Sequence, residues 1–243
     1  REYSSAASDV YKRQNLGELK LDSFQDNSVK IKIKAASLNF PDLLMTQGKY
    51  QNRPDLPFAL GMEGAGIVEK VGSGVSSFKE GDEVMFGGWG HGAIAESIIL
   101  PESLVSLKPK SLNFSEAASF KTAYLTAYVG LIRRGELKQG ETLLVHGASG
   151  GVGMAAVQMG KLYGAKVIAS GTSDEKLKIV KTWGADEIIN TGLEGSVSFR
   201  EEVKELTDGK GADVIYDPVG GDVFDESIRC INWGGRLLII GFT

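Results

Sequence analysis

The sequence predicts an α/β protein in which a compact β-barrel domain precedes a doubly wound, parallel α/β sheet. Three observations carry this prediction. A glycine-rich turn joins a short apolar strand to a helix near the middle of the chain, and strands alternate with helical segments from there to the end. The first half consists mainly of short strands separated by frequent turns.

The first half contains four segments with strand character. Residues 29–35 (VKIKIKA) alternate strictly between apolar and basic side chains, which is typical of a half-buried strand. Further strands are predicted at residues 64–71, 83–86 and 93–100, with turn-rich pieces between them. Because the only helical signal here is brief, near residues 41–46, the strands favour a compact barrel.

Periodicity also predicts where the domains begin and end. Residues 1–14 show neither strand nor helix periodicity, and we expect a flexible or non-native leader. The barrel domain is expected at residues 15–118 and the second domain at residues 119–243. A single long helix at residues 115–134 is predicted to lead from one to the other, with Gly130 as an unfavourable interior residue.

The glycine-rich turn follows a predicted buried strand at residues 143–145 (LLV). Residues 147–153 (GASGGVG) carry almost no side chain, and residues 154–163 consist mostly of good helix formers. Backbone amides at a helix start are unpaired and lie at the positive end of the helix dipole, so they suit a phosphate. The strand–turn–helix context therefore indicates a phosphate-binding turn.

The turn has the spacing A-x-G-x-x-G, with Ala148 where the dinucleotide fingerprint has its first glycine. A pyrophosphate can approach only where no side chain intervenes, which accounts for Gly150, and Gly153 lies where helix meets strand. We expect Gly150, Gly151, Val152 and Gly153 to bind the cofactor. A glycine-rich turn without a ligand remains the alternative for the motif taken alone.

The rest of the second half alternates strands with helices. Strands are predicted at residues 166–169, 187–189, 214–216 and 236–240, and helices at residues 174–183, around 197–206 and at 222–231. This order implies right-handed βαβ units, with a ligand across the carboxyl ends of the first and fourth strands. Val219 and Phe242 follow later strands and are expected to flank the cofactor. Because such folds usually have a sixth strand, we expect a sheet left incomplete by C-terminal truncation.

The residues after the second strand of this domain bear on the choice of nucleotide. Folds that bind NAD commonly carry an acidic residue about 20 residues past the fingerprint, for the ribose 2′-hydroxyl. Here the strand tip carries Ser170 and no carboxylate, and Lys176 follows one short turn later. An ammonium there could meet a 2′-phosphate, so we expect NADPH, with Ser170 and Lys176 at that phosphate. A solvated lysine is the alternative for Lys176 alone.

Composition excludes several classes. The 243 residues carry a formal net charge of −4 and no basic stripe, which argues against nucleic acid and anionic membranes as partners. No apolar run approaches the roughly 20 residues needed to span a bilayer. The single cysteine, Cys230, excludes an internal disulfide and fits a reducing compartment, so we expect a cytoplasmic protein.

Five segments together resemble one known family. They are ASLNFPDLLMTQGKY at residues 36–50, LGMEGAGIVEKVGSGV at 60–75, LTAYVGL at 125–131, VHGASGGVG at 145–153 and YDPVGGD at 216–222. In this order they are similar to the zinc-free quinone oxidoreductase branch of the medium-chain dehydrogenase/reductase superfamily. The resemblance implies a GroES-like barrel before a Rossmann domain, NADPH as cofactor, a quinone or α,β-unsaturated carbonyl as substrate, and a homodimer at full length.

The resemblance also implies roles for residues. Asn39 and Tyr50 would border the substrate and the nicotinamide, Thr126 would bond the nicotinamide carboxamide, and Tyr128 is a further candidate for lining the pocket. Between Asn39 and Tyr50, many members of the branch have a second tyrosine, where this chain has Leu44. That difference bears on substrate preference more than on hydride chemistry.

Residue types argue against zinc. Asn39 stands where zinc-using relatives have a cysteine, and Met62 stands where their G-H-E motif has its histidine. An amide and a thioether are poor zinc ligands beside thiolate and imidazole. His91 and His146 are expected to be loop and strand-end residues, and Cys230 a packing residue. We therefore expect no metal.

Other functions stay open beside an NADPH-dependent, zinc-independent quinone or enone reductase. A 2-enoyl thioester reductase is the alternative within the enzyme class. A non-catalytic RNA-binding or structural protein is the alternative outside it, since some relatives of the branch have such roles. An inactive piece is a third alternative, because an open sheet edge invites pairing.

Overall fold

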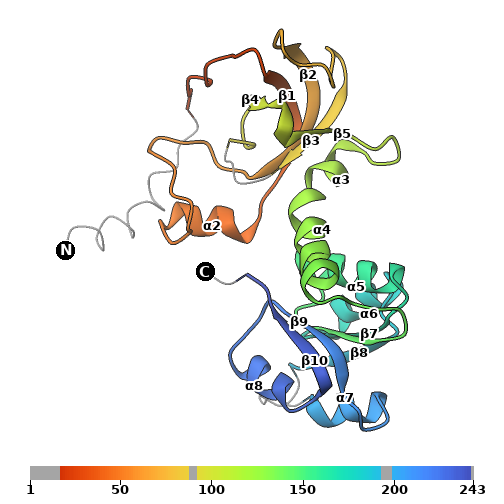
Figure 1. Cartoon of the computed structure of the whole chain (residues 1–243). Coiled ribbons are helices and arrows are strands. Elements are labelled where there is room, and N and C mark those ends of the chain that lie inside the picture. Colours follow the sequence, from red (N-terminus) through yellow and green to blue (C-terminus); the bar gives the residue numbers. More distant parts are fainter. Residues whose placement is uncertain (1–16, 88–91, 193–198, 242–243) are drawn as a thin grey trace, which may run out of the picture. The chain divides into compact units, whose positions relative to one another are not determined.

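The computed structural model describes residues 17–87, 92–192 and 199–241. The predicted leader at residues 1–14 lies outside the described residues, as do His91 and Phe242. The chain forms two compact units that divide between Thr122 and Ala123 (Figure 1). None of the described helices is long and apolar enough to cross a membrane.

The first unit is built on one antiparallel sheet (Figure 1). Its strands are β1 (Ser28–Ser37), β2 (Glu63–Val71), β3 (Glu83–Gly87), β4 (Ser97–Pro101) and β5 (Val105–Leu107), in the order β4-β1-β2-β3-β5. The alternation expected at residues 29–35 is present, because Val29 and Ile31 are fully buried against Val68 and Val84. A short helix, α2 (Phe40–Thr46), follows β1, and a 3₁₀ turn, η1 (Glu102–Leu104), follows β4.

Two expectations for this unit were inaccurate. The strand predicted from residue 93 begins only at Ser97, because the amides of Ala93 and Ile94 donate instead to the carbonyls of Gly61 and Leu60 in a loop. The strand β5 was not predicted at all, since its three residues are too few to show a period.

The single helix predicted at residues 115–134 is also wrong. The structure has α3 (Phe114–Ala118), then α4 (Lys121–Tyr128), then a π-helical stretch, η2 (Val129–Arg134). In η2 the amide of Gly135 donates to the carbonyl of Gly130 at 2.7 Å. A Cβ on Gly130 would lie 3.2 Å from the ring of Tyr216 and 3.2 Å from Ile240, so glycine allows this close packing.

The second unit contains a five-stranded sheet in which every pair is parallel. Its strands are β6 (Thr142–Val145), β7 (Lys166–Gly171), β8 (Glu187–Asn190), β9 (Ala212–Asp217) and β10 (Ile231–Ile239), in the order β10-β9-β6-β7-β8. Counted along this unit, the order is 5-4-1-2-3, which confirms the predicted doubly wound sheet and puts its switch point between β6 and β9.

Helices connect these strands, namely α5 (Gly151–Leu162), α6 (Asp174–Thr182), α7 (Arg200–Leu206) and α8 (Asp222–Ile228). Two apolar clusters cover the two faces of the sheet. One contains Val145 and Val214 with Ala156 of α5, and the other contains Leu144 with Val203 of α7. The helix predicted at 222–231 ends three residues early, because the chain turns into β10 there.

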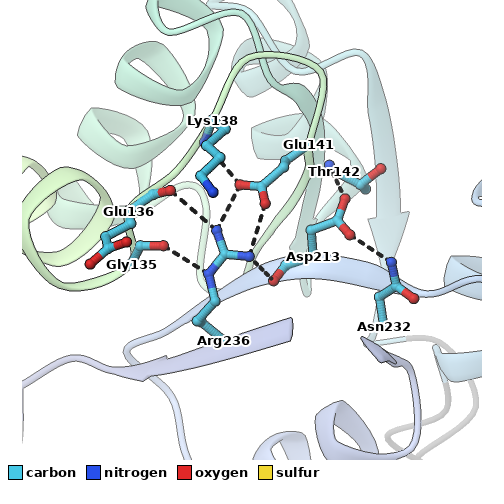
Figure 2. Close-up of polar contacts among 8 residues, drawn as sticks. All are labelled: Gly135, Glu136, Lys138, Glu141, Thr142, Asp213, Asn232 and Arg236. Atoms are coloured by element: carbon cyan, nitrogen blue, oxygen red, sulfur yellow. Dashed lines mark hydrogen bonds and ion pairs between the residues drawn. The ribbon is translucent and has the colours of Figure 1, made fainter. Parts of the chain in front are cut away.

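One cluster of charges lies at the amino ends of β6 and β9 (Figure 2). The guanidinium of Arg236 on β10 binds both carboxylate oxygens of Glu141, at 2.9 and 2.7 Å. Its remaining hydrogen bonds go to the carbonyls of Gly135, Glu136 and Asp213. Arg236 therefore ties the loop that follows η2 to the edge of the sheet.

Replacing Arg236 by methionine is expected to destabilise the protein by about 2 kcal/mol, since a bidentate, partly buried pair and three carbonyl bonds are lost. Arg229→Met is a matched control, because Arg229 is 60% exposed and pairs with Glu226 one turn away; it should cost at most about 0.5 kcal/mol. Chemical denaturation measures both. The hydrogen bonds from Arg236 also lower the pKa of Glu141, so this contribution is present above pH 4.5 and is lost as the pH falls further. Equal losses in the two variants would contradict this account.

Candidate functional site

The glycine turn lies at the carboxyl end of β6. The backbone of Gly147 has φ of +55°, a conformation that favours glycine. The amide of Ala148 donates to the carbonyl of Ser170 at the end of β7 (3.0 Å), and the amide of Gly150 donates to the carbonyl of Gly147 (2.9 Å). Helix α5 begins at Gly151, three residues earlier than predicted, so the last glycines of the turn form the first turn of the helix.

The glycines of this turn serve two different purposes. A Cβ on Gly153 would lie 2.4 Å from the carbonyl oxygen of Gly147, so the fold itself requires glycine there. Gly150 has φ of −80°, and a Cβ would meet only the Gly147 oxygen, at 3.3 Å. A Cβ on Gly151 would meet nothing within 4 Å. Neither backbone strain nor packing accounts for Gly151, whereas close approach of a phosphate to bare amides does. The residues present therefore fit the phosphate groups of a nucleotide cofactor.

The end of β9 lies beside this turn. Asp217 is buried, and its Oδ1 accepts hydrogen bonds from the amides of Val219 (2.8 Å) and Gly220 (2.9 Å). Its Oδ2 is buried and has no hydrogen-bond partner among the described residues. The side chain of Val219 is exposed and lies next to Gly147, whose Cβ would be 3.3 Å from it. The structure thus brings Val219 to the glycine turn.

A buried polar group lies directly under the turn. His146 is 1% exposed, with Nδ1 2.6 Å from the hydroxyl of Ser170 and Nε2 2.9 Å from the hydroxyl of Ser227. Ser227 donates its single proton to the carbonyl of Val223, so it must accept from Nε2–H of the imidazole. Nδ1 is then an acceptor and Ser170 donates to it. This arrangement assigns the neutral Nε2–H tautomer.

Burial favours the same neutral form. Desolvation lowers the pKa of His146 to about 4, although the charge of Asp217 acts in the opposite direction. The ring also packs against Phe199, with centroids 4.8 Å apart. His146 is therefore a neutral link between β6, β7 and α8, and the expectation of an ordinary strand-end residue missed this role.

The residues predicted to meet a 2′-phosphate have different surroundings. Ser170 is buried and donates its hydroxyl proton to His146. Lys176 is exposed in the first turn of α6, where its amide donates to the hydroxyl of the cap residue Ser173. Lys176 is thus accessible to a ligand, and a contact of either residue with a phosphate stays a prediction.

In the first unit a buried carboxylate holds Asn39. Glu63 on β2 is 1% exposed, and its Oε1 accepts from the hydroxyl of Ser37 (2.6 Å) and from Nδ2 of Asn39 (2.9 Å). Its Oε2 accepts from the amide of Thr122 (2.8 Å), in the first turn of α4. Burial lowers the pKa of Lys121, and the negative charge of Glu63 acts in the opposite direction. One side chain thus links the Asn39 amide to the backbone of Thr122.

A second buried carboxylate fixes the backbone around Asn39. Asp42 accepts from the amide of Asn39 (2.8 Å) and from the amide of Gly61 (3.1 Å). Burial raises the pKa of Asp42, against the effect of these backbone hydrogen bonds. Tyr50 lies four residues beyond α2, half-buried in a loop, and no described contact joins it to Asn39. Sequence reasoning missed both Glu63 and Asp42.

The remaining candidates lie on α4. Thr126 is half-buried and Tyr128 is exposed at the end of the helix. Tyr124, one turn from Tyr128, donates its hydroxyl to Gln158 of α5. Among the described residues no group of three or more His, Cys, Asp or Glu side chains could hold a metal ion. Burial raises the pKa of the Cys230 thiol to about 11, which makes it a poor nucleophile.

Comparison with known proteins identifies the family. Residues 25–110 match the family described as alcohol dehydrogenase GroES-like domain, and residues 151–243 match the one described as zinc-binding dehydrogenase. The chain is similar to Escherichia coli quinone oxidoreductase, solved in complex with NADPH, with a TM-score of 0.82 and 33% identity over 93% of this chain and 71% of that one. The chain belongs to the quinone oxidoreductase branch of the medium-chain dehydrogenase/reductase superfamily.

Two further proteins are similar to this chain. The quinone oxidoreductase-like protein 2 homolog of Nematostella vectensis is 40% identical over 97% of this chain. The CurK enoyl reductase structure has a TM-score of 0.83 and 31% identity over 92% of this chain and 68% of that one. The chain spans 61% of the length of the Nematostella relative.

Membership confirms the fold predicted from the sequence, a GroES-like domain followed by a Rossmann-type parallel sheet. Within the second unit the structure brings together Val219, Ser170 and the turn that carries Gly150 to Gly153. The roles of all these residues, and those of Asn39, Tyr50, Thr126 and Tyr128, stay predictions.

Proposed function

We propose that this quinone oxidoreductase relative is an NADPH-dependent, zinc-independent reductase that transfers hydride to a quinone or another α,β-unsaturated carbonyl. The observation that carries the proposal is Gly151, a glycine at a helix start that neither packing nor backbone geometry requires. Its position at the switch point of a doubly wound sheet is where such folds bind nucleotides. The NADPH complex of the Escherichia coli relative supports the choice of cofactor.

Bound NADPH would supply the hydride. The residues of this chain would have to bind and orient the nucleotide and the substrate, and to exclude water. The amides of Gly151 and Val152 at the start of α5 would bind the pyrophosphate, with Gly150 before them and Gly153 allowing the helix to pack closely. Val219, beside the turn, and Phe242 would flank the nucleotide.

The proposed reaction needs little electrophilic activation of the substrate carbonyl by the protein. A quinone or enone spreads the charge that it gains over a conjugated system, so no metal is needed to polarise an isolated carbonyl. Asn39 and Tyr50 are proposed to contact the substrate, Thr126 the nicotinamide carboxamide, and Tyr128 the pocket. Positioning of the two reactants then provides most of the acceleration.

Fluorescence titration and turnover test the function directly. Titration of the protein with NADPH should quench tryptophan or enhance nucleotide fluorescence with saturation, and a benzoquinone or naphthoquinone should then be reduced at the expense of NADPH. Absence of saturable binding would remove the proposal. NADPH binding without reduction of any quinone or enone would support the nucleotide site but contradict the proposed reaction.

Lys176→Ala should weaken NADPH binding about tenfold and leave NADH binding nearly unchanged, because its exposed ammonium is proposed to contact the 2′-phosphate, which NADH lacks. Lys178→Ala, on the same helix, is the matched control and should change neither dissociation constant. The two constants are measured by the same titration. Equal loss for both nucleotides would place Lys176 outside the phosphate site.

Treatment with EDTA should leave turnover unchanged. Asn39 and Met62 stand where zinc-using relatives have a cysteine and a histidine ligand. The Asn39 amide also donates a hydrogen bond to the Glu63 carboxylate. Dialysis against the chelator, followed by metal analysis and a rate measurement, checks this. A rate that falls on dialysis and returns with added Zn²⁺ would contradict zinc independence.

A 2-enoyl thioester reductase is the second candidate, since the CurK enoyl reductase has the same fold and 31% identity. Comparison of kcat/KM for a quinone and for an enoyl thioester separates the two. A homodimer, a cytoplasmic location and the absence of nucleic-acid binding remain parts of the proposal. Salt-dependent retention of RNA on a filter would instead favour a non-catalytic role.

A further inference from the structure

We infer that Glu63 is a positioning residue of the proposed reductase: it fixes the orientation of the Asn39 amide, so that the bound ligand meets the carbonyl oxygen and must offer a hydrogen-bond donor at this point. The inference rests on the proposed function for its kinetic consequence. The orientation itself rests on contacts within the first unit alone.

The orientation follows from counting protons. Ser37 has one hydroxyl proton and donates it to Oε1 of Glu63 at 2.6 Å, so its oxygen can only accept from the amide of Asn39. The Glu63 carboxylate receives every hydrogen bond that it makes and donates none. Two acceptors therefore face the same end of the amide, at 3.1 and 2.9 Å. That end has to be the NH₂ group, and Oδ1 points away from Glu63.

The exposed part of the amide is then its oxygen side. Glu63 is 1% exposed, whereas Asn39 is half-buried, so Nδ2 is directed toward the interior. An amide oxygen has two lone pairs, and Oδ1 can face the start of α2 while accepting a further hydrogen bond. A ligand group that binds there must be a donor. A hydroxyl of the nucleotide or a hydroxyl of the substrate or product meets this requirement.

A carboxylate is needed for this arrangement, and an amide at position 63 cannot replace it. Glu63 uses both oxygens as acceptors, one for Ser37 and Asn39 and the other for the amide of Thr122. A glutamine side chain has one oxygen and one NH₂ group. Either the donors of Ser37 and Asn39 or the amide of Thr122 would therefore face the NH₂ group and lose their acceptor.

The experiment compares Glu63→Gln, Asn39→Asp and the double variant with a control on the same strand, Glu69→Gln, whose carboxylate pairs with Lys30 at the surface. Selective labelling with [¹⁵N]asparagine gives the side-chain NH₂ signals, and the Asn39 pair is assigned by its loss in Asn39→Asp. We expect this pair to be protected from solvent exchange and to shift in Glu63→Gln but not in Glu69→Gln. The double variant exchanges donor and acceptor across the pair, so it should recover most of the resistance to urea that Asn39→Asp loses.

The kinetic measurements identify the molecule that supplies the donor. Glu63→Gln should lower kcat/KM for the quinone at least about tenfold. If the donor belongs to the nucleotide, the NADPH dissociation constant should also rise in Glu63→Gln, whereas an unchanged constant assigns the donor to the substrate or product. Kinetic constants like those of the wild type, or an Asn39 pair that exchanges freely and ignores Glu63→Gln, would overturn the inference. If the wild type reduces no quinone, the proposed function fails, and the NMR and urea measurements still decide whether Glu63 orients Asn39.

Discussion

Replacing Gly151 by valine is expected to abolish NADPH binding while leaving the protein folded. The position is open inside the protein, since a Cβ would meet no atom within 4 Å, and residue 151 is the first of α5. A branched side chain there would fill the space in front of the unpaired helix amides, where the pyrophosphate is proposed to lie. We expect the dissociation constant to rise at least about 100-fold, at a cost in folding stability below about 1 kcal/mol.

Gly153→Ala gives the opposite result and is the matched control. Its single added methyl group would lie 2.4 Å from a backbone oxygen and 2.8 Å from the Cα of Ala148, so the backbone has to shift. We expect a loss of at least about 2 kcal/mol in the free energy of unfolding. Nucleotide titration and urea denaturation of both variants make the comparison. If Gly151→Val bound NADPH normally, the turn would not hold the pyrophosphate and the proposed function would lose its main support.

The parallel sheet was predictable because its signals are local. Buried strands such as residues 143–145 appear as short apolar runs, and the alternation of these runs with helices fixes the topology almost completely. The helix at residues 115–134 failed for a reason that is not local. Gly130 packs against Tyr216, which is far along the chain, and the helix widens to π geometry beside this contact.

The candidate site was also predictable only where its signals are local in the sequence. Glycine spacing located the turn, but it could not separate Gly153, which packing requires, from Gly151, which packing leaves free. The polar residues beneath the surface were missed, although each had a signal. Glu63 is the one charge in the apolar stretch at residues 63–68 of β2, and His146 follows a fully buried apolar run. A lone polar residue in such a run needs a partner, and only the fold shows which one.

Acid should destabilise the protein through His146. The imidazole is neutral in the folded state, and its pKa is lowered from 6.5 to about 4 by burial. Between these values the unfolded chain binds a proton that the folded chain does not, so unfolding takes up a proton and lower pH favours it. The contribution of a neutral His146 is therefore complete above pH 6.5 and declines as the pH falls toward 4. A shift of this size corresponds to about 3 kcal/mol.

His146→Gln isolates this effect, because glutamine keeps a donor for Ser227 and does not titrate. The variant should be less stable than the wild type at pH 7 by about 1–3 kcal/mol, since the hydrogen bond from Ser170 is lost in a buried place. Carboxylates with a lowered pKa, such as Glu141 and Asp186, destabilise both proteins equally in acid. The difference between the two free energies of unfolding should therefore shrink between pH 7 and pH 4.5. A difference that stays constant with pH would show that His146 is already charged in the folded protein or fully hydrated, and either result would contradict the buried, neutral tautomer beneath the nucleotide turn.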